Sequence, residues 1–196
     1  MRSAVAVYCG ARRGVVPVHA AALADLGEEL ARRRIRLIFG GGRVGLMGIL
    51  ADACLAAGGE VVGVIPKTMV ERELAHPGLT ALEVVGSMHE RKARMAELAE
   101  AFIAAPGGFG TLDEVFEAIT WTQLGLQAKP VGFLDVDGFF APLRAQLDQM
   151  LAAGFIEPPH REMLIFEADP QRLLDALAAT RVPPPRRELL RHGASR

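Results

Sequence analysis

Short apolar runs alternate with longer segments of helical periodicity along the chain, and this alternation limits the fold more than any other feature. The apolar runs, rich in Val, Ile and Phe, occupy residues 4–9, 37–40, 60–66, 82–86, 101–105, 130–135 and 163–167. Helical periodicity marks residues 19–34, 46–57, 88–100, 112–124, 138–153 and 170–179. Most of the runs are apolar on both faces, as strands covered on both sides should be. The pattern predicts an α/β fold with a doubly wound, mainly parallel sheet and helices on both faces.

The length of 196 residues suits one such domain and is short for two, so we expect a single domain over residues 1–182. Residues 183–196 begin with three prolines and are rich in arginine, which predicts a flexible basic tail. Residues 67–79 interrupt the alternation and should form a loop or a short irregular helix. This segment follows a strand at its carboxyl end, where ligands bind in doubly wound folds.

Composition excludes several classes of function. The formal net charge is −1, so no overall positive field attracts nucleic acid or an anionic membrane. No apolar stretch approaches the roughly 20 residues of a membrane helix, and the amino terminus lacks a signal sequence. Cys9 and Cys54 lack disulfide or zinc spacing, which indicates a reducing cytoplasm. The histidines share no metal-ligand spacing, and we expect no metal.

A first glycine-rich sequence, GGGRVG at residues 40–45, follows a strand and begins a helix. It satisfies the pattern G-x-G-x-x-G, in which small residues let backbone amides approach a phosphate. A dinucleotide site would place this pattern after the first strand and an acid at the end of the next strand. Here it follows the second strand, and Glu60 stands at the wrong end of the third. The glycines therefore serve either a tight turn or a phosphate contact, the latter through Gly41 and Gly42.

A second glycine-rich sequence, PGGFGTLDE, occupies residues 106–114 directly after a predicted strand. Gly107, Gly108 and Gly110 would let backbone amides approach an anion, and Thr111 should begin the next helix. Glu114 has two interpretations. The spacing TLDE matches a capping box, in which Glu114 would bond back to the backbone of Thr111. Alternatively, Glu114 faces a substrate.

The sequence SMHERKAR at residues 87–94 begins another predicted helix. Ser87 and Glu90 form a second possible capping box. Arg91 and Lys92 then stand nearest the carboxyl edge of the sheet, where cations oppose the helix dipole and call for an anionic partner. Because the next strand leads into residues 106–114, both helix starts should border one crevice. A sugar phosphate fits this set of groups.

These sequences together resemble the LOG (LONELY GUY) family of cytokinin riboside 5′-monophosphate phosphoribohydrolases, often labelled lysine decarboxylase-like. The resembling segments are VYCG at 7–10, GGGRVGLMG at 40–48, MHERK at 88–92, PGGFGTLDE at 106–114, ITWTQLG at 119–125 and KPVG at 129–132. The resemblance implies a Rossmann-like homodimer without a cofactor. It would hydrolyse the N-glycosidic bond of plain or N6-modified adenosine 5′-monophosphate, releasing the base and ribose 5-phosphate.

The same resemblance assigns catalysis to Arg91 and Glu114. It assigns substrate contacts to Glu73, Lys92, Gly108, Phe109, Gly110, Thr111 and Thr120. Together with these residues we expect Gly41, Gly42, Met88, Arg91, Gly107 and Glu114 to bind the substrate. The chain departs from the family at Ala11, where a serine is common and where Arg12 and Arg13 follow.

Three other functions compete with this assignment. A pyridoxal phosphate decarboxylase is excluded, because it needs a Schiff-base lysine in a much larger fold. A broader nucleoside 5′-monophosphate nucleosidase remains open. So does a non-catalytic carrier of a nucleotide or cofactor, similar to the molybdenum-cofactor carriers, which would not need the pair Arg91 and Glu114.

Overall fold

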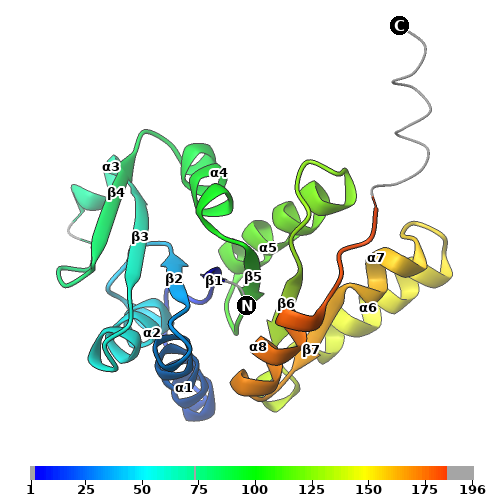
Figure 1. Ribbon diagram of the computed structural model, residues 1–196, viewed down its shortest axis with the longest axis horizontal. Coiled ribbons are helices and arrows are strands. Elements are labelled where there is room, and N and C mark those ends of the chain that lie inside the picture. The colour runs from blue at the N-terminus through cyan, green and yellow to red at the C-terminus, as the bar shows by residue number, and fades with distance from the viewer. Residues whose placement is uncertain (1–2, 73, 185–196) are drawn as a thin grey trace, which may run out of the picture.

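The computed structural model describes residues 3–72 and 74–184 (Figure 1). Within these residues one seven-stranded sheet has the order β4-β3-β2-β1-β5-β6-β7, and every pairing between neighbours is parallel. The strands are β1 (Ala4–Tyr8), β2 (Arg36–Phe39), β3 (Val61–Pro66), β4 (Ala81–Val85), β5 (Ala101–Ala104), β6 (Val131–Leu134) and β7 (Leu164–Glu167). The doubly wound parallel sheet is confirmed, and each strand lies within one residue of its predicted ends.

The helices also follow the predicted order. They are α1 (Pro17–Arg32), α2 (Gly45–Ala56), α3 (Lys67–Val70), α4 (Met88–Leu98), α5 (Phe109–Gln123), α6 (Ala141–Ala152), α7 (Pro158–Glu162) and α8 (Pro170–Ala179), with a 3-10 turn η1 (Val136–Gly138). The short helix α3 fits the expectation for residues 67–79, whereas α7 was not predicted. The predicted helix 138–153 begins later, at Ala141, because Asp137 has a positive φ of 54° and Asp135 binds the amide of Phe140.

Two apolar cores cover the two faces of the sheet. Alternate residues of β1 supply both: Val5 and Val7 pack in the core with α1, α2 and α8, while Ala6 and Tyr8 pack in the core with α4, α5 and α6. Figure 1 shows α1 and α2 on the opposite side of the sheet from α4 and α5. Burial on both faces explains why the inner strands β1, β2, β3, β5 and β6 are continuous apolar runs, whereas the edge strand β4 is largely exposed.

The order of the strands places a crevice beside β1. From β1 the chain builds the sheet outward through β2 and β3 to β4, and then returns to add β5 on the other side of β1. Connections diverge at such a point, which leaves room for a ligand outside the carboxyl ends of the strands. The segments that follow β1, β2 and β5 meet there.

Two predicted features lie outside the described residues. Glu73 is one of them, and residues 185–196 of the predicted basic tail are the other. No helix in the described part of the chain is long and apolar enough to cross a membrane.

Candidate functional site

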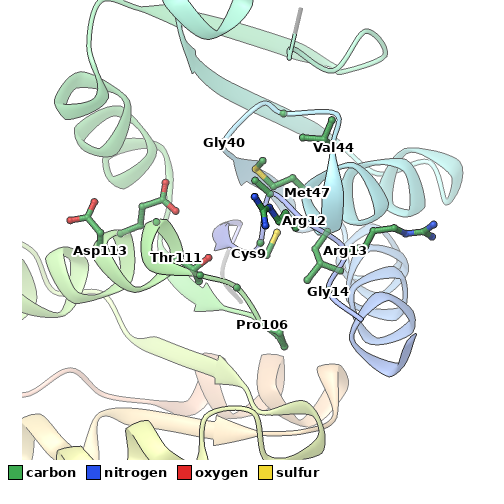
Figure 2. A pocket seen from close by; sticks show the side chains of 18 of the residues that line it. Cys9, Arg12, Arg13, Gly14, Gly40, Val44, Met47, Pro106, Thr111 and Asp113 are labelled. Atoms are coloured by element: carbon green, nitrogen blue, oxygen red, sulfur yellow. The ribbon is translucent and has the colours of Figure 1, made fainter. Parts of the chain in front are cut away.

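A cavity of about 540 Å³ opens at the carboxyl edge of the sheet, beside β1. Its volume lies within the usual range for small-molecule sites. The lining includes residues 9–14 after β1, parts of segments 40–47 after β2 and 106–114 after β5, and Ile65, Met69 and Leu74 around α3; Met88, Arg91, His19 and Phe139 complete it. Figure 2 shows Thr111 and Asp113 on one side of this pocket, Val44 and Met47 on the other, and Cys9 between them. The prediction that the starts of α4 and α5 border one crevice is confirmed.

The three glycines of the 106–114 segment have different surroundings. A Cβ on Gly107 would lie 2.1 Å from the Thr111 hydroxyl oxygen and 2.9 Å from the Gly10 nitrogen, so only glycine fits this turn. A Cβ on Gly108 or Gly110 would meet nothing within 4 Å. Both of these glycines line the pocket, so their missing side chains leave open space beside the backbone.

Helix α5 begins earlier than expected. Its N-cap is Gly108 and its first residue is Phe109, so Thr111 is the third helical residue rather than the first. No side chain caps the helix. The first amide groups of a helix have no acceptor within it, and here they border the pocket, where an anion can accept their hydrogen bonds.

Glu114 does not cap this helix, so the capping interpretation is wrong. Because α5 begins at Phe109, Glu114 is one turn too far along to bind the free amides at the start. Its Oε1 instead accepts a hydrogen bond of 2.7 Å from Nη1 of Arg91. The two side chains are only 10% and 8% exposed, and both line the pocket.

Burial and a neighbouring cation act in opposite directions on the ionisation of Glu114. Burial raises the pKa of this carboxyl group above its ordinary range, because the charged form loses hydration, and Arg91 opposes the rise. A carboxylate with a raised pKa is a better proton acceptor than an ordinary one. The pocket therefore holds a buried cation beside a carboxylate that can exchange a proton.

The start of α4 places Arg91 at the pocket. Ser87 is the N-cap, and its Oγ accepts a hydrogen bond from the Glu90 amide at 3.1 Å. Glu90 in turn accepts a bond of 2.8 Å from the amide of Gly86, one residue before the position expected for a capping box. The predicted N-cap at Ser87 is confirmed, whereas Glu90 binds the amide of Gly86 and not that of Ser87, so the full capping box does not form. With the helix fixed in this way, Arg91 is buried and its Nε donates to the carbonyl oxygen of Val64 on β3.

Lys92 turns toward α5 rather than into the pocket. Its ammonium group pairs with Asp113 at 3.1 Å and with Glu117 at 3.2 Å. Arg94, one turn further along α4, pairs with Glu83 on β4. The anionic partners expected for these cations are therefore carboxylates of the protein itself.

The first glycine-rich sequence packs tightly against its surroundings. Gly41 and Gly45 have positive φ angles of 72° and 66°, and a Cβ on Gly45 would lie 2.3 Å from the backbone of Ala11. The amide of Leu46, at the start of α2, donates to the Gly10 carbonyl oxygen. These contacts account for a tight turn. Gly42 lines the pocket and Gly41 does not, so the predicted phosphate contact stays a prediction.

The structure divides the predicted binding residues into two groups. Those that line the pocket are Gly42, Met88, Arg91, Gly107, Gly108, Gly110, Thr111 and Glu114. Those described but outside its lining are Gly41, Lys92, Phe109 and Thr120. Phe109 is 94% exposed, and Thr120 lies further along α5 with its hydroxyl bonded to the Phe116 carbonyl. Binding roles for this second group stay predictions.

Several pocket residues were missed by reasoning from the sequence. His19 lies in the lining against the ring of Phe139, with ring centroids 5.4 Å apart, although the histidines gave no signal in the sequence. Arg12 and Arg13 also line the pocket. The only feature of the sequence that could have drawn attention to Arg12 and Arg13 is that they follow Ala11, where the family commonly has a serine. An apolar wall adds Val44, Leu46, Met47, Ile65, Met69 and Leu74.

Cys9 and the metal-ligating residue types give no further reactive centre. Burial raises the pKa of the Cys9 thiol well above its ordinary range, so the thiolate is disfavoured at neutral pH. Within residues 3–72 and 74–184 no group of three or more His, Cys, Asp or Glu is placed to hold a metal ion.

Comparison with known proteins identifies the family. The family model described as "Possible lysine decarboxylase" matches residues 47–177. The probable cytokinin riboside 5′-monophosphate phosphoribohydrolase LOGL2 of Oryza sativa subsp. japonica is 44% identical over 88% of this chain and 71% of its own length. The phosphoribohydrolase LOG7 of Arabidopsis thaliana is also 44% identical, over 88% of this chain and 80% of its own length.

Solved structures support the fold. The molybdenum cofactor carrier protein of Chlamydomonas reinhardtii superposes with a TM-score of 0.68, covering 97% of this chain and 99% of the carrier. At 18% identity this likeness shows the Rossmann-like fold alone. The family model and the curated relatives go further: the chain belongs to the LOG family of cytokinin riboside 5′-monophosphate phosphoribohydrolases.

Proposed function

We propose that the protein hydrolyses the N-glycosidic bond of adenosine 5′-monophosphate or its N6-modified forms, giving the free base and ribose 5-phosphate. The observation that carries this proposal is the buried pair of Arg91 and Glu114, which lines the same pocket as the uncapped start of α5. Relatives named as phosphoribohydrolases cover most of the chain and support it.

The start of α5 is suited to the 5′-phosphate. Gly108 and Gly110 leave open space beside the backbone, and the first amides of the helix can donate to phosphate oxygens at the positive end of the dipole. Thr111, which is buried and lines the pocket, adds a hydroxyl. Phosphate binding is remote from the bond that breaks, so its energy can hold the sugar in a reactive position.

Glu114 is suited to the chemistry at the ribose. Breaking the bond between C1′ and the base nitrogen leaves positive charge on the sugar, as in glycosidases, and a carboxylate nearby stabilises it. The base nitrogen takes the electron pair of the broken bond and a proton from solvent, and Glu114 later returns to solvent the proton that it receives from water, so that one water is consumed. A water oxygen bonds to C1′ and gives a proton to Glu114, whose raised pKa favours this acceptance. Arg91 orients the carboxylate and the sugar hydroxyls.

The apolar wall is suited to the base. Ile65, Met69 and Leu74 line the pocket around α3, and Met47 extends this wall toward Gly40. The ring faces of adenine and an apolar N6 substituent would bury apolar surface against this wall.

One assay tests the proposal. Purified protein is incubated with adenosine 5′-monophosphate, its N6-isopentenyl derivative and the two matching nucleosides, and released base is measured by chromatography. We expect base from the monophosphates and little from the nucleosides, because the nucleosides lack the group that the start of α5 binds. The nucleosides serve as matched controls, since they differ only in the phosphate.

The other outcomes separate the alternatives. Equal release from many nucleoside monophosphates would indicate a broad nucleosidase. Tight binding of a monophosphate without release of base would indicate a carrier and would contradict the enzymatic proposal. Release from nucleosides at the same rate would contradict the role given to α5.

We also propose that the protein acts as a homodimer in the cytoplasm. The resemblance implies the dimer, and the exposed positions of Phe109 and Thr120 outside the pocket are consistent with contacts to a second chain. The free, buried cysteines suit a reducing compartment. Light scattering at assay concentrations tests the dimer, and a strict monomer with full activity would contradict it.

A further inference from the structure

The guanidinium of Arg91 is held on three sides. Nε donates to the carbonyl oxygen of Val64 at 3.1 Å, and Nη1 donates to Glu114 at 2.7 Å. The third side is Gly40, the residue that directly follows β2. A Cβ built on Gly40 would lie 1.8 Å from Nη2 of Arg91 and 3.0 Å from its Cζ. The side chain of Arg91 therefore occupies the space that any other residue at position 40 would need.

The backbone conformation at position 40 does not require a glycine. Gly41 and Gly45 in the same sequence have positive φ, a conformation that favours glycine, but Gly40 does not. The Gly40 Cβ would meet the far end of a side chain, not backbone; its next neighbour is the sulfur of Met47 at 3.4 Å. An alanine at position 40 is thus compatible with the fold of β2, provided that Arg91 moves.

We infer that Gly40 is a positioning residue for Arg91: the missing side chain leaves the space in which the guanidinium lies against the end of β2 and reaches Glu114. The inference rests on the proposed function, because it assigns Gly40 to the orientation of a catalytic arginine. It also gives the first glycine-rich sequence a role other than phosphate binding.

The substitution Gly40→Ala should displace the guanidinium. Carbon and nitrogen in contact normally lie roughly 3.5 Å apart, so Nη2 would have to move by more than about 1 Å. A displacement of this size at a catalytic group can cost about 100-fold in rate. We therefore expect kcat for base release to fall about 100-fold while KM changes much less, because the start of α5 is untouched.

The ionisation of Glu114 provides a readout that does not depend on activity. Arg91 lowers the pKa of this carboxyl group and burial raises it, so moving the guanidinium away should raise the pKa further. NMR of isotope-labelled glutamate side chains follows this titration in the free protein, with Glu114→Gln used to assign the signal. The groups coupled to this carboxylate are Arg91, Lys92, Asp113, Tyr8 and Cys9.

Gly78→Ala is the matched control. A Cβ on Gly78 would approach no atom closer than 3.5 Å, and the residue lies outside the pocket. We expect both the Glu114 titration and kcat of this variant to match the wild type. An unchanged Glu114 pKa in folded Gly40→Ala would overturn the inference.

A double variant covers the possibility that Gly40→Ala does not fold. Lysine lacks the Nη2 atom, so Arg91→Lys should relieve the collision, and Gly40→Ala should then change stability far less in the Arg91→Lys background. Equal destabilisation by Gly40→Ala in both backgrounds would overturn the inference. If the wild type releases no base, the proposed function fails, while the NMR titration and this double-variant comparison still test the positioning.

Discussion

Replacing Glu114 with glutamine separates a catalytic carboxylate from a structural one. Glutamine has nearly the same shape and keeps an oxygen that can accept the hydrogen bond from Nη1 of Arg91, which is 2.7 Å long in the wild type. It removes the negative charge and the ability to take a proton. Since both side chains are about 90% buried, the change is confined to the pocket and its pair.

Two contributions to the free energy of unfolding oppose each other in Glu114→Gln. Arg91 loses a countercharge, which destabilises the fold, while the cost of burying a carboxylate disappears. The folded pKa of Glu114 is raised, so its contribution to stability is greatest below the unfolded pKa and is lost as pH rises through the folded pKa. Glutamine removes that cost at any pH at which the wild-type carboxyl group is ionised. We expect a net change of about 1 kcal/mol or less, against roughly 3 to 5 kcal/mol for Arg91→Met, which leaves a buried charge unpaired.

The effect on the reaction should be much larger. Loss of a positioned acid–base group typically slows turnover about 10²- to 10⁴-fold. This corresponds to about 3 to 5 kcal/mol of activation free energy, several times the expected change in stability. Urea unfolding and release of base from adenosine 5′-monophosphate measure the two quantities on the same preparation.

Glu117→Gln is the matched control, because Glu117 lies on the same helix and pairs with Lys92 outside the pocket. We expect its turnover to stay within a few-fold of the wild type. Turnover of Glu114→Gln near the wild-type rate, in a protein of unchanged stability, would refute the catalytic role of Glu114.

Two further substitutions test the supports of the fold. Ser87→Ala removes the oxygen that caps α4 and should cost about 1 kcal/mol of unfolding free energy in a urea titration, and no loss would contradict the capping role. Glu29, which is 6% exposed, accepts hydrogen bonds from Arg32 and Arg33; the bond from Arg32 lowers its pKa most, although burial opposes this. A carboxyl group whose pKa is lowered by folding stabilises the folded state above its unfolded pKa, and this stabilisation is lost as pH falls through the folded pKa. Glu29→Gln should therefore cost roughly 1 to 3 kcal/mol of unfolding free energy near pH 7 and little near pH 2. An equal cost at both pH values would contradict this assignment.

The inner strands were predictable because a strand that is buried on both faces must be apolar throughout, so the apolar run and the strand nearly coincide. The edge strand β4 is largely exposed, but its Val and Leu residues still give an apolar run. Capping of α4 was predictable for a similar reason, since Ser87 and Glu90 interact within one helical turn. The short helix α7 could not be predicted from the sequence, because five residues are too few to show a helical period.

The partner of Glu114 could not be predicted from neighbouring residues in the sequence. The spacing from Thr111 fits a capping box, but a box forms only if the helix begins at Thr111, and here it begins at Phe109. The partner of Glu114 is instead Arg91, 23 residues earlier in the sequence and on another helix. No periodicity within α5 encodes that distance.

The sequence by itself determined which segments become strands and helices, and which segments carry glycine-rich turns, because these depend on neighbouring residues and on burial. Only the tertiary structure decided which charges meet. It paired Arg91 with Glu114 and Lys92 with Asp113, and it brought His19 into the pocket. The physical reason is that β1 and β5 are adjacent in the sheet although the chain between them builds three other strands first. Their following loops therefore share one pocket that sequence order does not reveal.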